Sequence, residues 1–330
     1  MKAAGSVDYN CFTLRCKSYE DRGERHSSGY DDVRYLIEGI LRLKPEQFEP
    51  MENGGRYGYR KGVSFNGIEI YYDGNSLDMG ANVSMSGTGC RTYAQFHPME
   101  DLLGRIYDGV KDGEINPTRV DLAYDDFEGC LAPKRIIDII REGQMRTRVK
   151  RRCRAIISID GTDKDEGDTV YIGSEKSDKR TRIYDKAKEQ GDYEGVWNRL
   201  EMVFRHDHAR AVLEALVAGE LPLGETMAGI LSDQIAFIER DDVNISRCSL
   251  AAWWVEFLEN VKRIRLMLKE KPVQTVERLA EYVDRTLSAC VYVLSETFGD
   301  SFWQRIKERG KQKIRRRHLS MLNNHTLLSV

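Results

Sequence analysis

The sequence predicts an α+β fold, in which a central, largely antiparallel β-sheet with flanking helices is followed by a mostly helical C-terminal part. Two patterns carry this prediction. Up to about residue 208, apolar residues recur at every second position in many short segments, which is typical of strands. Beyond residue 208 they recur at helical spacing. Hydrophobic residues make up 41% of the 330 residues, enough for a packed core.

Strands and helices alternate irregularly in the first part. The segment 57–72 predicts a hairpin, because its Asn66-Gly67 pair supplies the positive φ angles of a type I′ turn. A Gly-rich turn at 86–89 is expected between strands 82–85 and 92–96. The other expected strands span 7–15, 118–125, 155–160, 169–172, 181–186 and 197–204. Helices are expected at 31–43, 99–110 and 133–142, the last beginning at Pro133.

The second part has a different character. Apolar residues at helical spacing predict helices at 208–219, 249–271, 275–298 and 301–318, with breaks at 219–224 or 241–247. Trp253 and Trp254, at the start of one of these helices, are expected in the core. The chain is therefore predicted to divide into two domains, 1–208 and 209–330.

Charge is balanced overall but clustered locally. Lys and Arg number 51 against 53 Asp and Glu, a net charge of −2, so the average composition does not indicate a nucleic-acid binder. However, the segment 145–154 holds six cations and no acid, and the segment 305–317 holds eight cations and one acid. Such clusters attract phosphate backbones, although solvated helix faces carry them as well, and two of them favour DNA as a partner.

The cysteines and the hydropathy pattern indicate a cytoplasmic protein. The seven cysteines are scattered, with no CxxC pair, which matches neither a disulfide framework nor a zinc knuckle. No apolar run reaches membrane-spanning length, and no N-terminal signal is visible. We therefore expect a reducing compartment and no membrane partner.

Acidic residues mark two of the expected strands. In TRVDLAYDD (118–126), Arg119, Asp121 and Asp125 share one face, and carboxylates on a rigid strand are suitable oxygen ligands for Mg²⁺ or Mn²⁺. An edge strand with a solvated polar face is the alternative. In WNRLEMVFR (197–205), Glu201 lies in mid-strand, where Glu is uncommon. Either a metal ion or an ion pair with Arg199 or Arg119 would explain it.

A tyrosine lies between cations in RTRIYDKAK (180–188). In a strand, Arg182, Tyr184 and Lys186 point to one face. This pattern favours a hydroxyl that meets a phosphate, with the two cations holding the non-bridging oxygens. A phenol is protonated at neutral pH, so attack on phosphorus needs a metal or nearby positive charge. Tyr171, in an apolar run, is the second candidate nucleophile, although packing explains it better.

Two other motifs indicate no site. His206-Asp207-His208 is the closest histidine spacing. In a strand, however, both histidines would point to the face opposite that of Glu201, and a strand end explains the pair better than a metal site. Ser86-Gly87-Thr88-Gly89 does not complete a GxGxxG motif.

Taken in order and spacing, three segments resemble the Rep_trans family: TRVDLAYDD, TVYIGSEKSDKRTRIYDKAKE and WNRLEMVFR. The segments GIEIYYDG and SMSGTGCR are similar to family segments too, so that the resemblance covers roughly residues 7–210. Members are rolling-circle plasmid replication initiators and related relaxases of integrative conjugative elements.

The resemblance implies a mechanism. Family members nick one DNA strand at an origin through a tyrosine, leaving a 5′-phosphotyrosyl link and a free 3′-OH. The matching tyrosine is Tyr184, and the matching ligands of Mg²⁺ or Mn²⁺ are Asp121 and Glu201, with Asp125 as a further candidate. Which of Asp121, Asp125 and Asp126 bind the metal stays open. Arg119 is expected to orient the carboxylates or to contact phosphate.

The resemblance also implies partners. Initiators of this kind act as homodimers with a host helicase. Residues 1–208 are then the DNA-nicking domain, and 209–330 a domain for origin recognition or oligomerisation. Two alternatives stay open: a conjugative relaxase with the same chemistry, and a sequence-specific DNA-binding protein without catalysis.

Overall fold

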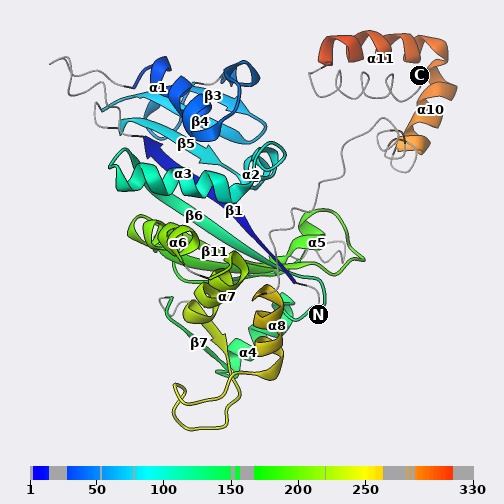
Figure 1. Ribbon diagram of the computed structural model, residues 1–330. Helices are drawn as coiled ribbons and strands as arrows, with labels where there is room; N and C mark the ends of the chain where they lie inside the picture. The colour runs from blue at the N-terminus through cyan, green and yellow to red at the C-terminus, as the bar shows by residue number, and fades with distance from the viewer. Residues whose placement is uncertain are drawn as a thin grey trace. The chain divides into compact units, whose positions relative to one another are not determined.

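The computed structural model describes residues 3–14, 28–52, 54–76, 79–149, 153–156, 167–219, 221–262, 280, 283 and 287–314. The chain forms two compact units, Met1–Leu268 and Lys269–Val330 (Figure 1). The first unit contains the sheet and the helices that pack on it. It extends past residue 208, so the expected division there, between nicking and recognition, is not a break in packing and stays a functional prediction.

Ten strands form one sheet in the order β2-β3-β4-β5-β1-β6-β11-β10-β9-β8. Every strand pair in it is antiparallel, which confirms the predicted fold class. The strands are β1 (Ala3–Leu14), β2 (Glu49–Pro50), β3 (Tyr59–Phe65), β4 (Ile68–Gly74), β5 (Ala81–Met85), β6 (Ile115–Asp126), β8 (Cys153–Ile156), β9 (Thr169–Ile172), β10 (Lys179–Asp185) and β11 (Asn198–Arg205). β1 and β6 are the longest and form the middle of the sheet (Figure 1).

Alternation along the strands separates an apolar face from a polar one. On β6, Val120, Leu122 and Tyr124 are fully buried and belong to the hydrophobic core. Four helices pack against this apolar face: α3 (Met99–Lys111), α4 (Pro133–Arg141), α6 (Asp207–Ala218) and α7 (Leu223–Gln234) (Figure 1). The opposite face of β6, β11 and β10 holds Arg119, Asp121, Asp125, Glu201 and Arg182.

The hairpin of β3 and β4 is confirmed. Asn66 and Gly67 have φ angles of 42° and 87°, as a type I′ turn requires. The neighbouring prediction is wrong. Residues 86–96 form no glycine turn and no strand; they contain helix α2 (Gly87–Tyr93), with the Ser86 hydroxyl as its N-terminal cap. The two glycines suggested a turn, but Gly89 fits against the backbone of Gly67 only because it lacks a side chain.

The predicted helical segments agree with the structure, but two short strands were missed. Residues 31–43 form α1 (Tyr30–Tyr35) and the π-helix η2 (Leu36–Leu41), as expected of a helical segment. The break predicted at 219–224 is confirmed, because α6 ends at Ala218 and α7 begins at Leu223, where the buried Gly224 and Met227 pack inward. Two short strands were not anticipated: β7 (Met145–Thr147), within the first basic cluster, pairs with β12 (Ile235–Phe237).

The C-terminal residues that the structure describes are helical. α8 (Ala252–Lys262) belongs to the first unit, and its Trp254 is fully buried among aromatic rings, as predicted. α10 (Ser288–Phe298) and α11 (Asp300–Lys313) belong to the second unit. Residues 150–152 and 315–317 of the two basic clusters lie outside the described residues. Within the described ranges, no helix is long and apolar enough to cross a membrane.

Candidate active site

The sheet brings the three family-like segments together on adjacent strands. β6, β11 and β10 are neighbours, and antiparallel register places directly opposed residues on the same face. Tyr184 lies opposite Arg199, which lies opposite Asp125. Two residues further along the two strands, and on the same face, Arg182 lies opposite Glu201. The predicted polar positions of all three segments therefore share one face.

Tyr184 is buried, with 4% of its surface exposed. Its hydroxyl donates a hydrogen bond of 2.5 Å to Oε1 of Glu201 on β11. Burial raises the pKa of the phenol above its ordinary value, and the negative charge of Glu201 raises it further. Tyr184 is therefore a neutral phenol whose proton points at a carboxylate.

Both predicted cations lie next to Tyr184. The Arg182 guanidinium lies 4.1 Å above the centre of the Tyr184 ring. It also donates from Nε and Nη2 to Glu201 Oε2, at 3.1 Å and 2.7 Å. Lys186 Nζ lies 5.5 Å from the ring centre and pairs with Glu189. Lys186 begins a short helix, α5 (Lys186–Glu189), and does not continue the strand as expected.

The ion pair of Glu201 differs from the sequence-based alternative. Arg199 and Arg119 were the expected partners, but Arg182 holds the carboxylate. The reason is register: Arg182 lies directly opposite Glu201 on β10, whereas Arg199 lies two residues along the same strand and bonds to Asp125.

Asp121 and Arg119 form a second pair on β6. Arg119 donates from Nε and Nη2 to the two carboxylate oxygens of Asp121, at 2.8 Å and 2.5 Å. The Arg119 guanidinium lies 4.2 Å above the ring of Tyr9 on β1. Burial raises the pKa of Asp121 to about 6, although Arg119 opposes the shift.

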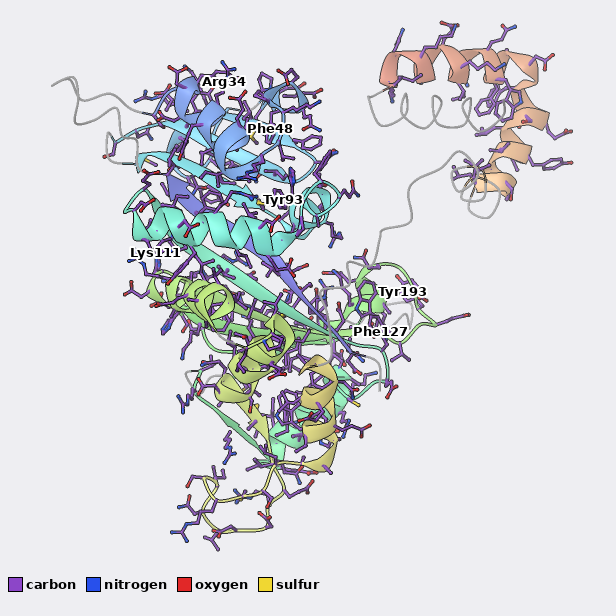
Figure 2. The ribbon with its side chains drawn as sticks, in the orientation of Figure 1. Arg34, Phe48, Tyr93, Lys111, Phe127 and Tyr193 are labelled. Carbon is purple, nitrogen blue, oxygen red and sulfur yellow. The ribbon has the colours of Figure 1, made fainter. Side chains whose placement is uncertain are left out.

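Asp125 and Asp126 have different partners. Asp125 accepts two hydrogen bonds from Arg199, at 2.7 Å and 2.9 Å, and one of 2.6 Å from the Trp197 indole. The ring of Phe127, labelled in Figure 2, packs against Trp197 with centroids 5.9 Å apart. Asp126 points to the other face, where its carboxylate accepts backbone N–H groups of the turn after β6. Asp126 therefore holds that turn in place.

Sequence reasoning missed Asp8. It lies at a bulge in β1 between Val7 and Tyr9, and its carboxylate accepts a hydrogen bond of 3.0 Å from Arg199 Nη1. Arg199 thereby connects carboxylates from β1 and β6. No sequence signal links Asp8 to the site, because its partner is 191 residues away.

The carboxylates do not form a ready metal site in this arrangement. Among the described residues, no three His, Cys, Asp or Glu side chains gather at one point. Asp121, Glu201 and Asp125 each form an ion pair with an arginine. Asp121 and Glu201 are nevertheless close enough for the charge of Glu201 to raise the pKa of Asp121. In this arrangement the carboxylate oxygens that a metal ion would use accept hydrogen bonds from arginines.

The arrangement has clear chemical capacity. A phenol donates its proton to a carboxylate, and a guanidinium contacts both groups. Such a constellation can remove the phenol proton and hold an anion beside the phenol oxygen.

Two protein-family models match the chain. The family model for replication initiation factors, Rep_trans, matches residues 115–309, and the model for the N-terminal domain of rolling-circle replication initiation proteins matches residues 28–102. The solved structure of the rolling-circle replication initiator protein from Geobacillus stearothermophilus is 32% identical, covers 80% of this chain and 98% of its own, and superposes with a TM-score of 0.68.

A Bacillus subtilis (strain 168) protein described as "Putative DNA relaxase NicK" is 28% identical over 253 residues, which are 72% of this chain and 70% of that protein. The Rep_trans match covers more than half of the chain and includes β6, β10 and β11. The chain therefore belongs to the Rep_trans family of replication initiation factors.

Proposed function

We propose that this protein is a rolling-circle replication initiator that nicks and rejoins one DNA strand at its origin, with Tyr184 as the nucleophile. The observation that carries the proposal is the hydrogen bond of 2.5 Å from the Tyr184 hydroxyl to Glu201, beneath the Arg182 guanidinium. Membership of the initiator family, which implies nicking, supports it.

The reaction is an exchange of phosphodiesters. The Tyr184 oxygen attacks phosphorus, the bond from phosphorus to the 3′ oxygen breaks, and a 5′-phosphotyrosyl bond forms. The phenol proton passes to Glu201 Oε1, and the leaving 3′ oxygen takes up a proton. One phosphodiester replaces another, so the reverse reaction can reseal the strand.

The arginines and Lys186 stabilise charge. Arg182 contacts both the phenol ring and the carboxylate, so it can hold a non-bridging phosphate oxygen as negative charge develops on the phosphoryl group. Lys186 adds a second positive charge beside the ring. Arg119 orients Asp121 through two hydrogen bonds.

The metal and the protein partners belong to the same proposal. Mg²⁺ or Mn²⁺ would supply Lewis-acid polarisation of the phosphate, held by Asp121 and Glu201, with Asp125 as a further ligand once released from Arg199. Action as a homodimer, cooperation with a host helicase and a cytoplasmic location complete the proposal. The described cysteines are free thiols, which supports a reducing compartment.

A conjugative relaxase is the second candidate. It uses the same chemistry, and the similarity to the Bacillus subtilis protein described as a DNA relaxase favours it. The higher identity of the replication initiator structure, 32% against 28%, favours the initiator.

Covalent trapping tests the proposal. Full-length protein is incubated with Mg²⁺ or Mn²⁺ and supercoiled DNA that carries its own flanking sequence, and adducts are resolved on a denaturing gel. We expect a metal-dependent adduct that is absent in Tyr184→Phe and reduced roughly 100-fold or more in rate by Glu201→Gln, the usual contribution of a general base. Tyr171→Phe is the matched control and should retain the adduct.

Other outcomes separate the alternatives. An adduct that persists in Tyr184→Phe and disappears in Tyr171→Phe would move the nucleophile to Tyr171. Salt-sensitive DNA binding without nicking or adduct, in the wild-type protein, would favour the non-catalytic DNA-binding reading.

A further inference from the structure

We infer that the sheet carries a second phosphate-binding subsite, centred on Arg180, which takes a phosphodiester group of the bound strand other than the one that is cut. The inference rests on the proposed function, because the ligand is the same DNA strand. Arg180 lies on β10, two residues before Arg182 and four before Tyr184, and shares their face. Cations thus recur about 7 Å apart along this strand.

The guanidinium of Arg180 is held in place but poorly neutralised. It lies 4.1 Å above the ring of Tyr171, whose ring also contacts the Arg154 guanidinium at 5.4 Å. Its Nε is buried and has no hydrogen-bond partner among the described residues. Its ion pair is with Glu175 at 3.9 Å, beyond hydrogen-bond distance, and Glu175 is 67% exposed. Arg182, Arg199 and Arg119, by contrast, each hold a carboxylate at hydrogen-bond distance.

Two more arginines add positive charge next to Arg180. Arg205 on β11 lies directly opposite Arg119 on β6. Burial lowers the pKa of Arg205, and the charges of Arg119 and Arg180 lower it further. Arg205 donates its hydrogen bond to the Ser177 carbonyl, which carries no charge. Three guanidinium groups therefore lie near one another, while Asp121 is held by Arg119 and the other nearby carboxylates, Glu175 and Asp178, are exposed.

This excess of positive charge favours a phosphate group that belongs to a polymer. Guanidinium groups recognise phosphate oxygens by directed N–H bonds. A ligand that already presents one phosphate at Tyr184 and Arg182 presents further phosphates along its backbone. Arg180 lies two residues before Arg182 on the same strand, and its Nε is a donor without a hydrogen-bond partner in the described part of the chain. A DNA strand that runs along β10 therefore satisfies both groups.

Salt dependence of binding tests the subsite. The probe is a fluorescein-labelled thymidine 15-mer, titrated with full-length protein by anisotropy between about 50 and 200 mM salt, the range in which phosphate contacts dominate. For Arg180→Gln we expect roughly fivefold weaker binding at low salt, and a slope of log K against log salt that is smaller by about 0.7, the value for one phosphate contact on a single strand. Arg180→Lys should restore most of the slope. Arg141→Gln, which removes an exposed arginine on α4, should leave it unchanged.

A second variant keeps the test valid if Arg180→Gln unfolds. Glu175→Gln removes the exposed acid beside Arg180, and binding should tighten about twofold at low salt because the guanidinium loses a competing charge. Asp138→Asn, an exposed acid on α4, is the matched control and should have no effect. An unchanged slope in a folded Arg180→Gln protein, or unchanged binding in Glu175→Gln, would overturn the inference.

The subsite and the proposed function fail separately. If the wild-type protein forms no adduct but the slope falls in Arg180→Gln, the subsite stands without the nicking reaction. If the adduct forms and the slope does not change, the reaction stands and the subsite is wrong.

Discussion

Buried charge is the main feature of the site at the scale of single residues. Asp121, Glu201 and Asp125 are all buried, and ionised carboxylates are costly in such places unless they are paired. Each has an arginine on its own or an adjacent strand. Removing one partner would leave the other as an uncompensated buried charge, so substitutions here affect stability as well as chemistry.

Asp121 gives a test of this cost through pH. Its pKa is about 6 in the folded protein, above the value of about 3.9 in an unfolded chain. The folded state therefore holds the proton more tightly, and this contribution to the free energy of unfolding is present below about pH 4 and lost as pH rises through about 6. Relative to Asp121→Asn, the wild-type protein should lose about 2 kcal/mol of unfolding free energy between pH 4 and pH 7.

Urea unfolding at several pH values, in metal-free buffer, measures this difference. The exposed Asp138→Asn variant should track the wild-type protein across the range. Parallel curves for wild type and Asp121→Asn would show that Asp121 ionises as it does in the unfolded chain.

Strand periodicity explains how much of the site could be predicted. The alternation of side chains along each strand placed Arg182, Tyr184 and Glu201 on polar faces. The register between the strands shows that these polar faces are one and the same. Parity could not say which arginine meets which carboxylate, because that depends on strand order and register. Asp8 was missed for the same reason, since a bulge in a distant strand brings it to Arg199.

At the scale of elements, the β3–β4 turn is a sensitive position. Gly67 has φ of 87°, and an added Cβ would lie 2.7 Å from the Gly89 backbone nitrogen. Gly67→Ala should lower the free energy of unfolding by about 2 kcal/mol, through backbone strain and this clash. Chemical denaturation measures the change.

Gly104 in α3 is the matched control for that substitution. Nothing lies within 4 Å of a Cβ added there. Gly104→Ala should therefore stabilise the protein, by about 0.5 to 1 kcal/mol, because alanine favours a helix interior. Equal effects of the two substitutions would contradict the assigned turn geometry.

Elements with strict alternation or strong helical spacing were the predictable ones. The strand at 169–172 matches β9, and the helix at 99–110 matches α3 within one residue. The misses are short or glycine-containing. Glycines in α2 suggested a turn, but Gly89 allows close packing of this helix against the backbone of Gly67. The three-residue strands β7 and β12 are too short to show a period.

At the scale of the whole molecule, the boundary of the first unit predicts how truncations behave. α6, α7 and α8 bury Leu213, Leu231 and Trp254 in the same core as the sheet. A protein ending at residue 268 should fold and unfold cooperatively, whereas one ending at residue 208 should not, because it exposes this core. Thermal unfolding followed by circular dichroism distinguishes them.

The shorter protein would also locate DNA recognition. If residues 269–330 carry it, the protein ending at 268 should bind a single strand normally and its duplex origin more weakly. Cooperative folding of the protein ending at 208 would instead show that the predicted division there is a true domain boundary.

The strand order of the sheet was beyond sequence reasoning. β1 pairs with both β5 and β6, and β11 lies between β6 and β10. The pairings of β1 with β5 and β6, and of β6 with β11, join residues at least 67 positions apart, and no local pattern encodes them. The fold class could be predicted because it depends on local periodicity.

The shared position of Arg182 has a consequence for control of the reaction. Its N–H groups bond to Glu201 Oε2, so an incoming phosphate must compete with that carboxylate for them. In the proposed reaction, a guanidinium that turns to the phosphate releases Glu201 Oε2, while the Tyr184 hydroxyl still donates to Oε1. Binding of a strand would therefore exchange one ion pair for another, and the hydrogen bond between Tyr184 and Glu201 is already formed before the strand arrives.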